Sequence, residues 1–298
     1  MAHVPVLLEE VIRLLDISQG KIFVDTTADG GGHLEEILKR LPEDGKMIGL
    51  DQDEEMIERL RQKFGKDKRT EFIHGNFRDI GSLLSEYAGT VDGILYDLGF
   101  SSLQLEESGR GFSFTKDEPL LMTLRRDLGP EDLTAEKIVN DWPEDRLKEI
   151  IRVYGEERFA GRIARRIAEE RRRGRIRRTV ELAEIIRSAV PKNYERGRIN
   201  PATRAFQALR ITVNDELGVL REGLAGGWNL LSPNGRMAVI SFHSLEDRIV
   251  KNFFRDNKQN DEAEILTKKP IVAVKEELLR NPRARSAKLR AAVKISMR

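Results

Sequence analysis

The stretch that decides the fold reads Lys21-Ile22-Phe23-Val24-Asp25-Thr26-Thr27-Ala28-Asp29-Gly30-Gly31-Gly32-His33. Its compact apolar run predicts a buried strand, and a helix pattern follows the glycines as far as Leu41. Consecutive glycines let the backbone adopt positive φ and approach a ligand closely. In doubly wound sheets, ligands bind beyond the carboxyl ends of the strands, where the strand order reverses. This stretch therefore predicts the first strand, turn and helix of a ligand-binding α/β sheet.

The same alternation of apolar runs and helix patterns continues on both sides of the middle of the chain. Further strands are predicted at 46–51, 70–74, 91–97, 236–242, 263–267 and 286–296, and helices at 5–16, 53–64, 214–231 and 244–254. Strands that alternate with helices favour a parallel sheet covered on both faces. We expect an α/β fold with a doubly wound, mostly parallel sheet.

Between about 106 and 208 the alternation stops, and only helix patterns remain. These patterns lie at 133–141, 143–153, 156–173, 179–190 and 202–213. A helical block inside an α/β chain predicts an inserted all-helical domain. The expected domains are therefore 1–105 and 209–298 for the two parts of the sheet domain, and 106–208 for the insert.

Composition excludes several classes of protein. The chain of 298 residues contains no cysteine, which excludes disulfides and thiolate metal sites, and its four histidines show no zinc-like spacing. No metal site is expected. The amino terminus lacks the pattern of a secretion signal, and no apolar run reaches the ~20 residues of a membrane span. These observations predict a soluble, cytoplasmic protein without a membrane partner.

Acidic residues at two further strand ends indicate which cofactor the sheet binds. Asp51 follows the glycines by about 20 residues, where a carboxylate accepts hydrogen bonds from ribose hydroxyls. Asp97 ends the strand at 91–97. A nicotinamide dinucleotide would also suit Asp51. Its pyrophosphate, however, favours the spaced pattern G-x-G-x-x-G, whereas the glycines of this chain are contiguous. S-adenosylmethionine carries a sulfonium cation and no phosphate, so acidic neighbours suit it better. The pattern is typical of a class I (Rossmann-like) methyltransferase.

Long motifs extend this interpretation over nearly the whole chain, which resembles the RsmH (MraW) family of ribosomal RNA cytosine-N4 methyltransferases. The matching segments are VPVLLEE (4–10), GGH (31–33), DGILYDLGFSS (92–102), RGFSF (110–114), YGEERFAGRIAR (154–165), PATRAFQALRI (201–211), ISFHSLEDRIVK (240–251) and NPRARSAKLRAA (281–292). The resemblance implies methylation of a cytidine in the decoding region of small-subunit (16S) ribosomal RNA. It also implies a methyltransferase domain interrupted by a helical domain.

The resemblance implies a set of cofactor contacts. They are Gly31, Gly32, His33, Asp51, Phe77, Asp97 and Gln104. Phe77 would lie against the adenine, although an ordinary core phenylalanine is the alternative. His33 lies at the start of a predicted helix, so a capping or packing role is an equal alternative to a cofactor contact. His243 has two possible roles: it belongs to a helix-capping turn with Ser244 as the N-cap, or it is catalytic.

The chain departs from the family in two places. A segment that usually resembles P-L-D-M-R-M is here Pro119-Leu120-Leu121-Met122-Thr123-Leu124, which loses one acid and one base. A histidine common before the PAT segment is here Asn200. The first departure puts in doubt any substrate contact that the family makes there.

Direct, in-line attack on the sulfonium methyl needs alignment and an acceptor for the amino hydrogens of cytosine N4. We expect Asp97, or a carbonyl beside it, to accept from N4, and Phe100 to pack near a flipped-out base. An alternative is a non-catalytic homologue that binds ribosomal RNA during subunit assembly. Another is an amine methyltransferase that acts on a different RNA, DNA or small molecule.

Arginines are concentrated in the insert and near the carboxyl terminus, where phosphate attraction would hold RNA. Ten occupy about twenty residues of the insert: Arg158, Arg162, Arg165, Arg166, Arg171, Arg172, Arg173, Arg175, Arg177 and Arg178. Arg204 and Arg210 are expected to line the cleft between the two domains, and Arg283 and Arg285 belong to a second basic cluster that flanks the last strand. Together with Arg162, Arg165, Arg166 and Arg172 of the insert, these four are the expected RNA contacts. The alternative is a solvated helix face that pairs with Glu169 and Glu170. The predicted partner is small-subunit ribosomal RNA or the 30S particle.

Overall fold

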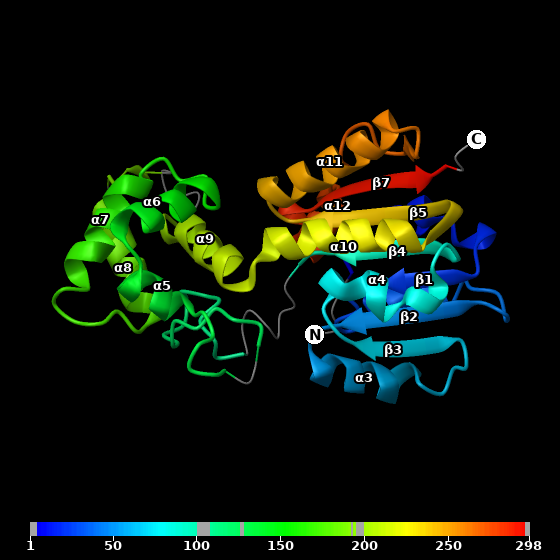
Figure 1. Ribbon diagram of the computed structural model, residues 1–298, viewed down its shortest axis with the longest axis horizontal. Coiled ribbons are helices and arrows are strands. Elements are labelled where there is room, and N and C mark those ends of the chain that lie inside the picture. The colour runs from blue at the N-terminus through cyan, green and yellow to red at the C-terminus, as the bar shows by residue number, and fades with distance from the viewer. Residues whose placement is uncertain (1–4, 100–107, 126–127, 192, 195–199, 296–298) are drawn as a thin grey trace. The chain divides into compact units, whose positions relative to one another are not determined.

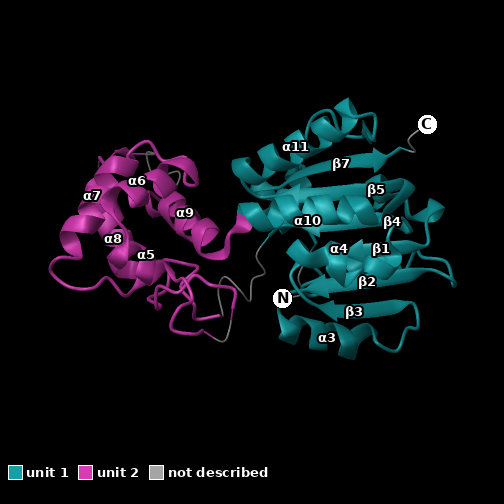
Figure 2. Ribbon diagram, in the orientation of Figure 1, with its two compact units in different colours: residues 1–99, 217–298 teal, residues 100–216 magenta. Residues whose placement is uncertain are grey.

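The computed structural model describes residues 5–99, 108–125, 128–191, 193–194 and 200–295. The chain divides into two compact units, unit 1 of Met1–Gly99 with Leu217–Arg298, and unit 2 of Phe100–Glu216 (Figure 2). Unit 2 thus interrupts unit 1 along the chain. Its upper boundary lies eight residues beyond the expected 208, because helix α9 (Ala202–Asn214) continues past that position.

Unit 1 is built on a seven-stranded sheet in the order β3-β2-β1-β4-β5-β7-β6 (Figure 1). Its strands are β1 (Ile22–Asp25), β2 (Lys46–Asp51), β3 (Thr70–His74), β4 (Val91–Asp97), β5 (Leu231–Ser241), β6 (Ala263–Ile265) and β7 (Lys288–Lys294). Neighbouring strands from β1 to β5 pair in parallel, and β7 pairs antiparallel with β5 and β6. The predicted mostly parallel sheet is confirmed, and β5 begins five residues earlier than expected.

Helices cover both faces of this sheet. They are α1 (Leu8–Leu15), α2 (Gly32–Leu38), α3 (Glu54–Phe64), α4 (Ile80–Leu83), α10 (Glu216–Leu230), α11 (Ser244–Gln259) and α12 (Lys275–Arg280). One buried apolar cluster joins the first three helices to the sheet, and a second joins α4, α10 and α11 to it. The doubly wound arrangement is therefore confirmed, while α4 and α12 were not predicted.

Unit 2 is built from helices. They are α5 (Ala135–Asp141), α6 (Glu144–Val153), α7 (Ala160–Glu170), α8 (Thr179–Ala189) and α9. In α7 the buried residues are Ala160, Ile163, Ala164, Ile167 and Ala168. This spacing forms one apolar stripe, and such stripes from the five helices share a single core. The helical character expected of the insert is confirmed. Within the described residues, no helix combines the length and apolarity that a membrane crossing requires.

Candidate active site

The carboxyl ends of β1, β2 and β4 meet at the point where the strand order reverses. Asp25 is the last residue of β1, paired in register with Gly49 of β2 and Leu95 of β4. Asp51 and Asp97 end those two strands, two residues further along each. Three aspartates therefore lie along one edge of the sheet, at the position where open α/β sheets bind ligands.

The turn after β1 requires glycine at Gly31. This residue has φ of 74°, in the left-handed region that disfavours side chains. A Cβ added there would lie 2.7 Å from Phe64 and 2.8 Å from Leu60 of α3. The glycine therefore lets the turn pack directly on α3 and leads the chain into α2.

Asp51 organises the turns on either side of it. One carboxylate oxygen accepts from the backbone N–H of Asp29 at 2.9 Å, and the other accepts from the N–H of Asp53 at 2.9 Å. The side chain is buried, and this burial raises the pKa of Asp51 to about 6. Each carboxylate oxygen has a further lone pair, so Asp51 can also accept from the hydroxyls of a ribose.

Asp25 is a site residue that the sequence prediction did not select. It is 2% exposed and accepts from the N–H of Thr27 at 3.2 Å. The pKa of Asp25 is raised to about 7, mainly by burial; the carboxylates of Asp97 and Asp51 add to this rise, and His33 and the N–H of Thr27 oppose it. Its place at the end of an apolar strand, directly before the glycine turn, was the available signal. A buried acid between two other acids gives this edge a strong preference for a cationic ligand.

His33 connects Asp97 to the amino-terminal segment. Its Nε2 lies 2.9 Å from the carbonyl oxygen of Val6, and its Nδ1 lies 3.6 Å from a carboxylate oxygen of Asp97. The N–H of Asp97 in turn donates to the hydroxyl of Thr27 at 2.8 Å. The imidazole is 5% exposed, so its side chain serves packing within unit 1, and a cofactor contact of His33 stays a prediction.

Phe77 belongs to the short 3-10 helix Phe77–Asp79 that follows β3. Its half-buried ring meets the ring of Tyr96 edge-on, with centroids 5.6 Å apart. A Cβ on Gly223 of α10 would lie 2.5 Å from the Phe77 ring, so the ring packs closely against that helix. Phe77 therefore contributes to the core, and its predicted adenine contact stays a prediction for the exposed part of the ring.

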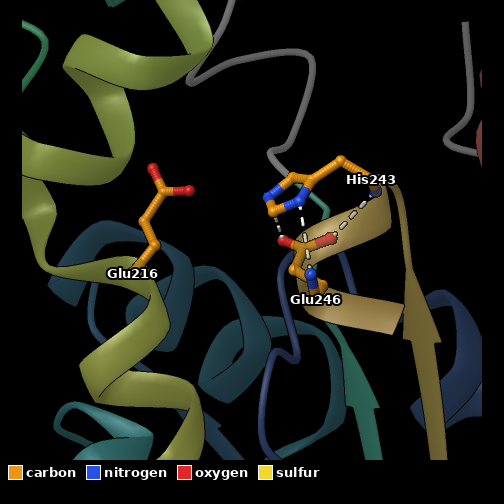
Figure 3. A group of neighbouring side chains, drawn as sticks. All are labelled: Glu216, His243 and Glu246. Atoms are coloured by element: carbon orange, nitrogen blue, oxygen red, sulfur yellow. Dashed lines mark hydrogen bonds and ion pairs between the residues drawn. The ribbon is translucent and has the colours of Figure 1, made fainter. Parts of the chain in front are cut away.

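The turn between β5 and α11 is fixed by a capping box, and the prediction of Ser244 as N-cap is wrong. His243 is the N-cap, and its Nδ1 accepts from the N–H of Glu246 at 3.3 Å (Figure 3). The Glu246 carboxylate accepts from the N–H groups of His243 and Phe242, at 3.1 and 2.8 Å. Helix α11 begins at Ser244 because the His243 imidazole accepts from an N–H group of its first turn.

The same turn contacts the end of β4. The ring of Phe242 would lie 2.9 Å from a Cβ on Gly99, so Gly99 lets the ring lie against the backbone that follows Asp97. The next residues along that loop, including the predicted catalytic Phe100 and cofactor-binding Gln104, lie outside the described residues.

The residue types of these turns favour S-adenosylmethionine over a phosphate ligand. Residues 25–33, 51–53, 74–77 and 97–99 contain five aspartates and no lysine or arginine. A sulfonium cation is attracted to such an edge, whereas a pyrophosphate would be repelled and would find no cationic side chain in these turns.

Many arginines of unit 2 form intramolecular pairs. Arg166 lies 2.7 Å from Glu170 and 3.6 Å from Glu169, as the alternative of a paired helix face predicted. Arg171 donates to the carbonyls of Val139 and Trp142 at the end of α5. Arg173, Arg175 and Arg178 pair with Glu170, Asp141 and Asp117, respectively. Four arginines of the block at 165–178 are thus paired with acids of their own unit.

The other predicted RNA contacts lie in varied surroundings. Arg165 is exposed and 3.9 Å from Glu144, and Arg172 is exposed. Arg210 donates to both carboxylate oxygens of Glu216, at 2.8 and 3.0 Å. In unit 1, Arg283 and Arg285 lie in the 3-10 helix Pro282–Ser286, where Arg285 is exposed and Arg283 is half-buried. All remain predicted contacts.

The departure from the family at 119–124 falls in the core of unit 2. Of the residues that replace the acid and the base, Leu121 is half-buried and Thr123 is 4% exposed, and both are chain neighbours of Met122 in the apolar cluster. The Thr123 hydroxyl accepts from the N–H of Arg125 at 3.1 Å. Asn200 accepts from the N–H of Ala202 and so supports the start of α9. Both changes therefore act within the packing of unit 2.

Comparison with known proteins gives one consistent family. The model of the MraW methylase family matches residues 1–295. The ribosomal RNA small subunit methyltransferase H of Syntrophotalea carbinolica is 48% identical and covers 97% of this chain and 96% of its own length. The protein of that name from Persephonella marina is 47% identical, with 98% and 99% covered. That from Heliobacterium modesticaldum is 45% identical, with 98% of each chain covered.

Proposed function

Because the chain belongs to the MraW methylase family, we propose that it methylates the N4 amino group of a cytidine in the decoding region of small-subunit (16S) ribosomal RNA. The methyl donor of this family of enzymes is S-adenosylmethionine. In the structure, the observation that carries the methyl-transfer part of the proposal is the edge of three aspartates, Asp25, Asp51 and Asp97, at the strand-order reversal. When bound, the cofactor supplies an activated methyl group on a cationic sulfur.

Several residues of unit 1 would hold that cofactor, each in a different way. Asp51 has lone pairs left for ribose hydroxyls after accepting from Asp29 and Asp53. Asp25 and Asp97 lower the electrostatic energy of a positive charge near the β1 and β4 ends. Gly31 lets the turn pack on α3, which would hold the main chain of the turn in place for a ligand.

Asp97 is also the proposed acceptor for the target amine. The lone pair of cytosine N4 is delocalised into the ring, so an acceptor for its amino hydrogens returns electron density to nitrogen. The backbone of Asp97 is held by Thr27, and its carboxylate lies beside the buried His33. This fixed orientation aligns an acceptor without a covalent enzyme intermediate, which agrees with a chain that has no cysteine.

The target base would leave its stack to reach this edge, and basic side chains would hold the RNA around it. We expect the enzyme to act in the cytoplasm, where small subunits are assembled. RNA affinity should fall steeply with salt, because each phosphate contact releases counterions.

Transfer of a labelled methyl group to small subunits from a strain that lacks this gene tests the proposal. Mass-spectrometric mapping should find one new N4-methylcytidine in the decoding region. Methylation of another atom or another RNA would refute the assignment of the substrate. No transfer, together with intact RNA binding, would instead favour a non-catalytic RNA-binding protein.

A further inference from the structure

One group of arginines in unit 2 differs from the block at 165–178 because it gathers on aromatic rings. The guanidinium of Arg158 lies 4.8 Å from the ring centroid of Phe159 and 4.8 Å from that of Tyr194. Arg162 lies over Phe159 from the next turn, at 5.7 Å. The two rings meet edge-on with centroids 4.9 Å apart. We call Arg158, Phe159, Arg162, Tyr194 and Arg204 the arginine–aromatic cluster.

A buried carboxylate holds this cluster in place. Glu157 has a fully buried side chain, and both of its oxygens accept from the Tyr194 hydroxyl, at 2.8 and 3.0 Å. It also accepts from the N–H of Phe159 at 2.7 Å. Arg204 donates to the Tyr194 hydroxyl at 2.8 Å and lies 3.6 Å from Glu157. A buried carboxylate is tolerated only when it is well paired, so these contacts fix the rings and Arg204 together.

The backbone around the cluster is also closely packed. A Cβ on Gly155 would lie 2.6 Å from the carbonyl oxygen of Arg204, so the turn before α7 lies directly on α9. Arg158 and Arg162 are exposed above this support, and Arg204 is one-third exposed. The cluster contains three arginines, whereas its acids are the buried Glu157 and the exposed Glu156 next to it along the chain. The cluster therefore carries a net positive charge on a rigid base.

We infer that the arginine–aromatic cluster, rather than the block at 165–178, is the contact of unit 2 with single-stranded RNA next to the target base; this inference rests on the proposed function. Guanidinium planes on aromatic rings offer flat, charged surfaces on which unstacked bases and phosphates bind. The block offers less, because Arg166, Arg173 and Arg175 are already paired with acids.

Affinity for a fluorescently labelled single-stranded oligoribonucleotide of the decoding-region sequence tests this inference. The double variant Arg158→Ala with Arg162→Ala should bind about tenfold or more weakly, because each lost base stack or phosphate contact is worth that order. The slope of log affinity against log salt should become shallower by about 2. Arg173→Ala removes a guanidinium that is paired with Glu170, so it is the matched control and should bind almost as the wild type does.

Further variants keep the test decisive. Arg158→Lys keeps the charge and loses the flat guanidinium, so we expect an intermediate affinity; wild-type affinity would refute the stacking contact. An unchanged double variant, or a larger loss in Arg166→Ala, would overturn the inference. All variants should bind S-adenosylmethionine normally in calorimetry. A wild-type protein that binds the cofactor but transfers no methyl group to small subunits would instead contradict the proposed function.

Discussion

The affinity for S-adenosylmethionine should rise with pH, because the buried aspartates of the site hold protons near neutrality. Burial raises the pKa of Asp25 to about 7 and that of Asp51 to about 6. A sulfonium cation favours the ionised form of both groups, and ribose hydroxyls donate to an ionised Asp51. Binding of the cofactor must therefore displace the protons that these carboxyls carry.

The magnitude follows from the two pKa values. Near pH 6, about half of the Asp51 carboxyls and about nine-tenths of the Asp25 carboxyls are protonated in the free protein; near pH 8, only about a tenth of the Asp25 carboxyls are. If binding requires both in the ionised form, the dissociation constant should be about twentyfold larger at the lower pH. Without Asp25, only about a twofold change should remain from Asp51.

Isothermal titration calorimetry across this pH range measures the effect directly. Repeating the titration in buffers of different ionisation enthalpy should reveal release of about one proton near pH 6.5 in the wild type. Asp25→Asn is nearly isosteric and provides the matched control, with a flatter pH profile. A wild-type affinity that does not change between these pH values, or that falls as pH rises, would refute the reasoning.

Three further predictions concern stability and catalysis. The free energy of unfolding should fall by up to about 4 kcal/mol as pH rises from about 4 to about 7, because the folded protein keeps the proton of Asp25 in this window and the unfolded chain releases it. Denaturant melts of wild type and Asp25→Asn at several pH values check this. Parallel plots of unfolding free energy against pH for the two proteins would contradict it. Gly31→Ala should lose about 1–2 kcal/mol of stability, because alanine disfavours the left-handed φ of this position. It should also weaken cofactor binding, because the added Cβ would displace Phe64 and Leu60. An unchanged melting temperature would contradict this. Asp97→Ala should lower methyl transfer about 100-fold or more at saturating substrates, because an oriented proton acceptor contributes on that order; near-normal turnover would remove Asp97 from the catalytic role.

The local pattern of the sequence was sufficient to predict the sheet. The first four strands match within one residue, because each is a short apolar run that ends in a polar residue at the carboxyl edge. Helix α12 was missed because it is a short, highly charged segment without a buried residue, so it leaves little hydrophobic signal. The resemblance in sequence also predicted the family that the comparisons show.

The roles of individual charged groups depended on contacts between distant parts of the chain. Asp25 and Asp51 are strongly polar residues whose pKa values rise only because folding buries them at adjacent strand ends. A run of arginines in the sequence predicts a basic surface. Only the packed helices show that Arg175 pairs with Asp141 and that Arg158 lies on the ring of Tyr194. Periodicity and motifs thus determined the fold and the family. Burial and pairing between segments far apart in sequence, which no local pattern encodes, decided which charges are available for chemistry.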